Sequence, residues 1–311
     1  MHMSDALVSP AVGGAFWAAS GWALARSART VSRDAPDGGV PLTGVLGAFI
    51  FAIQMVTFAI PGTGSSGHLG GGLLLALLLG PEGAFLTLAS VLVVQALFFA
   101  DGGLLALGCN LFNMGFIPAF VALPLAGNRR TPGILAAAVA SALLGAAAVA
   151  FETRLSGITQ LPLGAFLLAL LPIHLVIGLV EGLATAAVLR FLHKARPELR
   201  TPGTRGWRPA ALVGLLALVT AGGLSVVASR NPDGLEWAIA RVAGREPAPP
   251  PDPAHLAAAR LQASAPLPDY ALKGREPGRA QTSLAGLAGG ALTLALVAGA
   301  AFALRAFRKA A

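Results

Sequence analysis

Apolar residues in this chain form long runs rather than the spaced stripes typical of soluble amphipathic helices. A helix needs ~20 mostly apolar residues to cross a bilayer. The third apolar run is short and contains Gly70, Gly71 and Gly72, so we expect irregular backbone that dips into a helix bundle and lines a cavity. The pattern predicts an all-α integral membrane protein with nine transmembrane segments: 8–28, 42–60, 68–80, 83–100, 104–126, 133–151, 163–192, 210–228 and 284–304.

Composition supports this fold class. Hydrophobic residues make up 55% of the 311 residues and charged residues only 12%, whereas soluble domains carry ~25% charged residues. The single Cys109 excludes a disulfide framework. The chain opens without a basic stretch followed by a small-residue cleavage site. We therefore expect no cleaved signal peptide, and an N-terminus with Met1 retained before the bulky His2 and its amine free.

The basic residues predict the orientation in the membrane. With the N-terminus outside and the C-terminus in the cytoplasm, 14 of the 22 Lys and Arg residues lie in or beside cytoplasmic loops. The opposite orientation would place these 14 charges on the wrong side. The net charge of +8 therefore reflects topology, and we expect a bilayer rather than nucleic acid as the partner surface.

A long Pro-rich stretch, residues 229–283, separates the last two apolar segments. Its composition predicts an extracytoplasmic, partly irregular loop. We expect two domains: a membrane domain over 1–200 and a second module over 201–311, which comprises two transmembrane helices and this loop.

The N-terminus offers a chelating group. The Met1 amine, the His2 backbone amide and the His2 imidazole are three nitrogens in sequence, and chelation through them closes one five-membered and one six-membered ring. Amide deprotonation would make the set planar, which favours Ni(II) or Cu(II) over tetrahedral Zn(II). By position alone, His2 is more simply explained as an accident of an unstructured terminus.

His68 strengthens the metal hypothesis. It lies in a Gly/Ser loop, residues 62–72, on the same predicted side of the membrane as the N-terminus. Glycines let such a loop enter a bundle and hold an imidazole there, and a near-membrane His is a functional candidate. The alternative is a flexible turn with a solvated His68.

Further polar residues fall at membrane depth and have two explanations. Hydrogen bonding between helices is the simpler one. A shell that orients the metal ligands is the other, and we expect it to draw on Ser66, Asn110, Asn113, His174 and Glu181, while His193 and His255 are expected to be solvated. The remaining membrane-depth polar residues are Gln54 and Gln95.

The first predicted helix carries small residues every fourth position. This stripe suits close contact with another membrane helix, either within the chain or on a partner protein. Its members are Ala11, Ala15, Ala19 and Ala23.

Three functional classes remain open on these residues. A metal-uptake component needs one fully ligated site, whereas a membrane metalloenzyme, with His2, His68, His174 and Glu181 as ligands and base, needs an open metal position. A passive channel needs a polar or charged ring, for which the chain offers few intramembrane charges. The Walker A, H-E-x-x-H and G-x-S-x-G patterns do not occur, so energy for uphill transport would come from another protein.

Several motifs together resemble the CbiM/NikM family, the substrate-capture components of energy-coupling-factor transporters for cobalt and nickel. The resemblance covers about residues 1–200. The motifs are the N-terminal sequence through Pro10, the loop from Ser66 to Gly71, the segment from Asn110 to Gly115, and the segment from His174 to Gly182. The sequences PDGLE at 232–236 and LPDY at 267–270 resemble the accessory subunit CbiN/NikN, fused here to the capture component.

The resemblance implies a planar four-nitrogen site formed by the Met1 amine, the His2 amide and imidazole, and the His68 imidazole. It implies Ni(II) as transported substrate, with Co(II) as the alternative, since Ser4, Asp5 and Ala6 are closer to the nickel pattern. It also implies a membrane coupling subunit and separate cytoplasmic ATPases as partners, location in a prokaryotic cytoplasmic membrane, and no enzymatic activity of the chain itself.

Overall fold

The computed structural model describes residues 2–34, 40–197, 207–224, 228–229, 231–245, 247–272 and 278–310. Most of these residues are helical, and each of the nine predicted segments overlaps a helix. The helices are α1 (Pro10–Asp34), α2 (Val40–Gln54), α3 (Gly72–Leu79), α4 (Pro81–Phe98), α5 (Leu107–Asn110), α6 (Thr131–Ser156), α7 (Leu163–Ala195), α8 (Trp207–Gly222), α9 (Gly234–Ala243), α10 (Pro253–Gln262) and α11 (Arg279–Ala310), with short 3₁₀ turns at Asp5–Leu7 (η1), Leu123–Ala126 (η3) and Pro268–Tyr270 (η6).

Length and hydropathy identify a multi-pass membrane protein. Within the described residues, five helical segments are long and apolar enough to cross a membrane, and the shorter apolar helices Leu42–Gln54 and Arg208–Gly222 accompany them. Nine crossings and the side on which each terminus lies stay predictions. The five spans are Pro81–Phe98, Leu107–Ala126, Thr131–Ser156, Leu163–Ala195 and Gln281–Ala303.

The predicted span 42–60 is wrong over its last six residues. Helix α2 ends at Gln54, and Phe58–Ile60 (β1) instead pairs antiparallel with Ser65–Gly67 (β2), with Phe58 opposite Gly67. The β-branched residues here favour extended backbone, and Pro61 disfavours helix at the residue before it. This hairpin leads directly into His68.

The predicted segment 68–80 is helical only from Gly72 onward. Gly71 adopts a φ of +75°, which a residue with a side chain rarely takes, so the backbone turns sharply between His68 and α3. The expected irregular stretch therefore lies immediately before the short helix, and it brings the His68 loop against α7.

Residues between α5 and η3 form a π-helical stretch, Leu111–Ala122 (η2), which contains Pro118. π-Helical turns are uncommon and often occur at functional sites. Asn110 ends α5 and Asn113 lies in the first turn of η2, so the change in helix type coincides with the two predicted polar residues.

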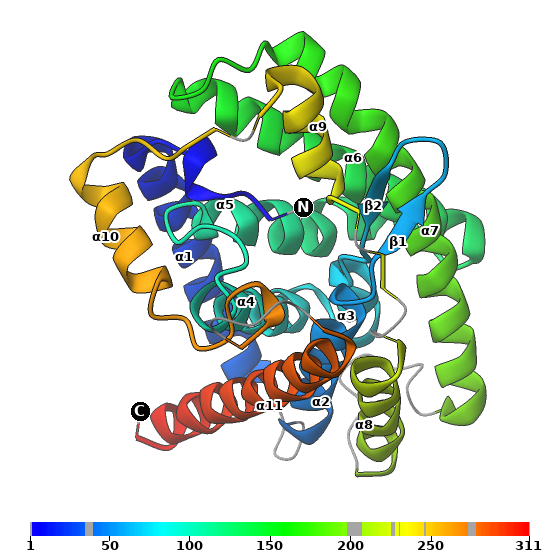
Figure 1. Cartoon of the computed structure of the whole chain (residues 1–311). Coiled ribbons are helices and arrows are strands. Elements are labelled where there is room, and N and C mark those ends of the chain that lie inside the picture. The colour runs from blue at the N-terminus through cyan, green and yellow to red at the C-terminus, as the bar shows by residue number, and fades with distance from the viewer. Residues whose placement is uncertain are drawn as a thin grey trace.

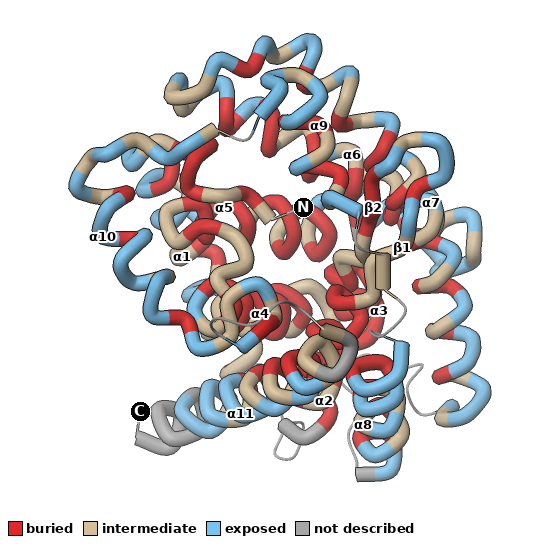
Figure 2. Tube along the Cα trace, viewed as in Figure 1, coloured by how far each residue is buried: buried red, intermediate tan, exposed pale blue. Residues whose placement is uncertain are grey.

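The described buried residues form a large cluster over α2, α3, α4 and η2 and a second one around the N-terminal residues. Figure 1 shows the N-terminus reaching the middle of the bundle, between α5, α6 and the β1–β2 hairpin, and Figure 2 shows buried residues concentrated there while α8, α10 and α11 carry many exposed ones. Met3, Leu7 and Val8 are completely buried. The second module packs on both clusters: α8 and α11 pack on α2, and α9 packs on α7 and contributes to the cluster around the N-terminal residues.

Candidate metal centre

The N-terminal segment is held inside the protein by hydrogen bonds to the loop and helix that follow α4. The Asn110 side chain accepts a hydrogen bond from the Met3 backbone N–H at 2.8 Å and donates one to the Met3 carbonyl at 3.1 Å. The Asp5 carboxylate accepts from the backbone N–H groups of Leu104 and Ala106 at 3.2 and 3.0 Å. These bonds fix the backbone next to His2. Met1 lies outside the described residues, so its predicted role stays a prediction.

His2 projects into a polar pocket made by α4 and the loop after it. Its Nε2 lies 3.2 Å from Gln95 Oε1, and its Nδ1 lies 3.3 Å from Asp101 Oδ1. Gln95 in turn donates to Gln54 Oε1 at 2.8 Å, and Gln54 donates to the Gly70 carbonyl at 2.7 Å. A chain of side chains therefore connects His2 to the loop that carries the second imidazole.

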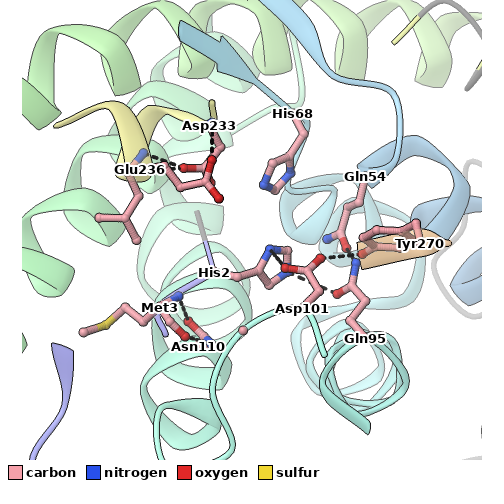
Figure 3. Close-up of polar contacts among 12 residues, drawn as sticks. His2, Met3, Gln54, His68, Gln95, Asp101, Asn110, Asp233, Glu236 and Tyr270 are labelled. Carbon is pink, nitrogen blue, oxygen red and sulfur yellow. Dashed lines mark hydrogen bonds and ion pairs between the residues drawn. The ribbon is translucent and has the colours of Figure 1, made fainter. Parts of the chain in front are cut away.

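The structure brings His2 and His68 together. Their ring centroids are 5.4 Å apart and the ring planes are inclined by only 14° (Figure 3). The His68 Nδ1 lies 3.3 Å from the Leu69 carbonyl, which can only accept, so the proton belongs on Nδ1 and the Nε2 atom carries the lone pair. An imidazole held in this tautomer is suited to metal ligation.

Glu181 anchors the loop that carries His68. Its two carboxylate oxygens accept hydrogen bonds from the backbone N–H groups of Gly70, at 3.2 Å, and Gly71, at 2.9 Å. This explains why an acidic side chain occurs in the middle of α7. Glu181 positions the backbone beside His68 and does not contact the histidine itself through these bonds.

The second module forms one wall of the site. Ser66 donates through its backbone N–H to the Pro232 carbonyl at 2.8 Å and through its hydroxyl to the Asn231 carbonyl at 2.9 Å. Asp233 then begins α9 with a capping box that pairs it with Glu236. Figure 3 shows Asp233 on one side of the two imidazoles, with Asp101 and Gln95 on the other.

Two further residues of the second module hold the site. The Tyr270 hydroxyl donates to the carboxylate of Asp101, the residue that faces His2. His255 is not solvated as expected but buried, with 2% of its surface exposed. Its Nε2 lies 3.0 Å from the Asp5 carbonyl and 3.1 Å from the Val8 carbonyl. It was misassigned because a Pro-rich loop usually lies on the surface, whereas α10 packs His255 against the N-terminal segment.

The remaining predicted polar residues lie deeper in the bundle. Asn113 donates to Glu152 Oε2 at 2.8 Å, and His174 Nδ1 contacts the Leu170 carbonyl one turn earlier in its own helix at 2.8 Å. Asn113 and His174, with His68, Glu181 and Asp233, line a cavity of about 50 Å³.

Sequence reasoning missed Asp101, Glu152, Asp233 and Tyr270 as site residues. Asp101 directly follows a predicted span. Asp233 lies in the PDGLE motif and Tyr270 in the LPDY motif. Those motifs were the available signal for the second module. Glu152 lies one residue beyond a segment whose predicted end was 151, which hid it.

The buried surroundings of His2 and His68 favour the neutral form of both imidazoles. Burial lowers the pKa of His2, although the Asp101 carboxylate acts in the opposite direction. Burial also lowers the pKa of His68, and the neighbouring His2 lowers it further. A neutral imidazole is the form that binds a metal, so burial keeps both rings competent at neutral pH.

Among the described residues, the stripe of small residues on α1 is buried only at its last member. Ala11, Ala15 and Ala19 are exposed, whereas Ala23 is buried. Three of the four positions therefore remain on the surface.

Comparison with known proteins identifies the family. Residues 2–199 match the family CbiM, described as "Cobalt uptake substrate-specific transmembrane region". The chain belongs to the CbiM family. Residues 207–306 match the PDGLE domain, so the second module is CbiN-like and the chain is a nickel-type fused member. As a member of this metal-transport family it is a membrane component of cobalt or nickel transport and not an enzyme.

Individual relatives support both parts. The fused nickel transport protein NikMN of Rhodobacter capsulatus is 31% identical, over 87% of this chain and 88% of its own length. The cobalt transport protein CbiM of Sorangium cellulosum is 36% identical, over 51% of this chain and 75% of its own. A crystal structure of a transition metal transporter is 32% identical with a TM-score of 0.55, over 64% of this chain and 95% of its own.

Proposed function

We propose that this CbiM-family chain is the substrate-capture component of an ATP-coupled energy-coupling-factor transporter that imports Ni(II). The proposal takes nickel rather than cobalt because a relative that matches 87% of the chain is named a fused nickel transport protein. Co(II) is the competing substrate, since the family description names cobalt and a shorter relative is a cobalt transport protein.

One observation carries the proposal: His2 and His68, from separate segments, stack with centroids 5.4 Å apart inside the bundle. Two imidazoles bound cis to one metal at ~2 Å place their centroids about 4.5 Å apart, and trans ligands place them about 6.3 Å apart. In the chelate, the amide is the middle donor, so the open position is cis to the His2 imidazole. Closing the site around a metal therefore requires the rings to approach by about 1 Å.

Metal binding also requires an exchange at His2. The six-membered chelate ring can close only through Nδ1, because Nε2 is too far from the His2 amide. In the structure Nδ1 faces Asp101 at 3.3 Å. We infer that Asp101, supported by Tyr270, holds the ring until the metal arrives and then releases Nδ1 to it. The carboxylate also attracts a divalent cation toward the same atom.

In the proposed site, a planar set of four nitrogens would favour nickel over zinc. A deprotonated amide is a strong donor that stabilises square-planar Ni(II), and Zn(II) gains nothing from this geometry. Such a site has no open position for substrate or water in its plane, which fits capture of an ion rather than catalysis on one.

Coupling to ATP would come from other proteins. We propose that the chain lies in a prokaryotic cytoplasmic membrane with the N-terminus outside, and that a membrane coupling subunit and cytoplasmic ATPases complete the transporter. The exposed small residues Ala11, Ala15 and Ala19 on α1 offer a close-packing surface for the coupling subunit.

The test adds residues before Met1. An N-terminal extension removes the free amine and displaces the amide, so we expect Ni(II) binding by the purified protein to be lost. His68→Ala should also abolish tight binding. His193→Ala should not, because His193 is a half-buried residue near the C-terminal end of α7. Bound Ni(II) should be diamagnetic, as square-planar nickel is. Undiminished binding after the extension, or paramagnetic six-coordinate nickel, would refute the planar site, and tighter Co(II) binding would reassign the substrate.

A further inference from the structure

The cavity beside His68 has the lining of a cation site. Its polar walls consist of two carboxylates, Glu181 and Asp233, two imidazoles, His68 and His174, the amide of Asn113 and the hydroxyl of Ser141. Neither Lys nor Arg is among the described residues that line it. At about 50 Å³ it has room for a few water molecules, since one needs ~10–15 Å³.

His174, which lines this cavity, has an unpaired nitrogen. The side chain is 2% exposed, and its Nδ1 lies 2.8 Å from the Leu170 carbonyl. A carbonyl only accepts, so Nδ1 carries the proton and Nε2 has the lone pair. Nε2 is buried and has no hydrogen-bond partner among the described residues. Metal-binding histidines commonly donate their other N–H to a backbone carbonyl in this way.

Asn113, which lines the same cavity, has an unpaired oxygen. Its Nδ2 donates to Glu152 Oε2 at 2.8 Å, which turns Oδ1 away from that carboxylate. The side chain is 2% exposed, and Oδ1 is buried without a partner in the described part of the chain. A buried polar atom without a partner is costly, so two acceptors lining one cavity indicate a shared ligand that supplies positive charge or protons.

We propose that this cavity is a second, weaker position for the divalent transition-metal ion, ligated by His174 Nε2 and Asn113 Oδ1 and completed by water. The inference rests on the proposed function, because the occupant is the ion that the chain transports. Imidazole nitrogen with amide oxygen suits Ni(II) and Co(II).

This second position should bind the metal ion weakly, because the protein supplies few ligands. Among the described residues, no group of three His, Cys, Asp or Glu side chains could hold a metal ion together. An ion here keeps most of its water and exchanges readily, as a transport step requires. His68 lines the same cavity, so a partly hydrated ion waits beside the capture site until the slower amide deprotonation fixes it there.

The second module closes this loading position. Gly234, the first residue of α9, packs so closely that a Cβ would lie 2.7 Å from Ile173 Cγ2 and 3.3 Å from His174 Cε1. The PDGLE segment thus forms the wall next to the His174 ring, and only a residue without a side chain fits there. The fused module would therefore fix the position of the His174 ring that binds the incoming ion.

The experiment removes the capture site and asks what binding remains. In the full-length His2→Ala/His68→Ala protein in detergent, equilibrium dialysis with Ni(II) should show one residual, weaker site. Adding His174→Phe, which keeps an aromatic ring but removes both nitrogens, should abolish it, and adding His193→Phe on the same helix should not. In the otherwise natural chain, His174→Phe should slow nickel loading while leaving the tight affinity unchanged.

The outcomes separate the two proposals. If the double variant binds no nickel, the cavity holds only water and the second position is refuted. If residual binding survives His174→Phe unchanged, the ligand assignment is refuted. If instead the natural chain binds no nickel, or His2→Ala/His68→Ala keeps the full affinity, the proposed function fails irrespective of the cavity.

Discussion

Asn110 should control nickel affinity without touching the metal. In Asn110→Leu, a side chain of similar size, the Met3 backbone N–H loses its hydrogen bond of 2.8 Å. The Met3 carbonyl loses its bond to Asn110 but keeps the one from the Gly103 N–H at 2.8 Å. The change therefore leaves one buried donor unpaired and removes one further hydrogen bond.

The magnitude follows from these two losses. A buried unpaired donor costs ~1–3 kcal/mol and a hydrogen bond contributes ~0.5–1.5 kcal/mol, so the ordered N-terminal segment loses about 2–4 kcal/mol. At 1.4 kcal/mol per tenfold, even the lower end weakens Ni(II) affinity about 30-fold. Because the segment can detach locally, we expect little change in the melting temperature and faster hydrogen exchange at Met3.

The assay is calorimetric or competitive titration of purified protein with Ni(II), with hydrogen exchange read by mass spectrometry. Asn128→Leu is the matched control, because Asn128 is exposed and accepts a hydrogen bond from the Arg130 backbone N–H within the same loop, at 3.2 Å. If Asn110→Leu binds Ni(II) within about threefold of the natural chain, instead of losing the expected ~2–4 kcal/mol, the segment does not position the site as argued.

Three further outcomes test the surroundings of the site. His255→Ala removes the donor to two carbonyls of the N-terminal segment, so Ni(II) affinity should fall about tenfold by titration, while equal loss in His193→Ala would point to a general effect. Glu181→Gln keeps one acceptor for Gly70 and Gly71 but replaces the other with a donor, so nickel binding should weaken with the fold intact, and unchanged affinity would contradict the anchoring role. At pH 9 the terminal amine, with an ordinary pKa of about 7.7–8.0, and both imidazoles are unprotonated, so nickel binding should release about one proton, from the amide. Calorimetry in buffers of different ionisation enthalpy measures this release, and a value of zero would exclude amide ligation.

The helical spans were accessible from sequence because hydropathy is a local property of each segment. Five of the predicted segments coincide with described helices long and apolar enough to cross a membrane. The error at residues 55–60 arose because an apolar run does not distinguish helix from strand, and only the pairing of Phe58 with Gly67 resolves it.

The candidate site was only partly accessible. His2 and His68 could be nominated from chelate chemistry and from a Gly-rich loop, and the motifs around Asn110 and Glu181 indicated that these residues matter. Their contacts could not be deduced: Asn110 holds Met3 across 107 positions, and Glu181 holds the Gly70–Gly71 backbone across 110 or more. Sequence patterns carry no information on which distant backbone a side chain will reach.

The sequence by itself determined the membrane class of this protein, its CbiM and PDGLE motifs and the two histidines, since hydropathy, charge and residue type are written in the chain. The tertiary structure decided how the second module enters the site. His255 contacts the Asp5 carbonyl from 250 positions away, and Tyr270 reaches Asp101 across 169. Those contacts exist only because burying the apolar faces of α8, α9 and α11 on the first domain brings their connecting loop over the N-terminus.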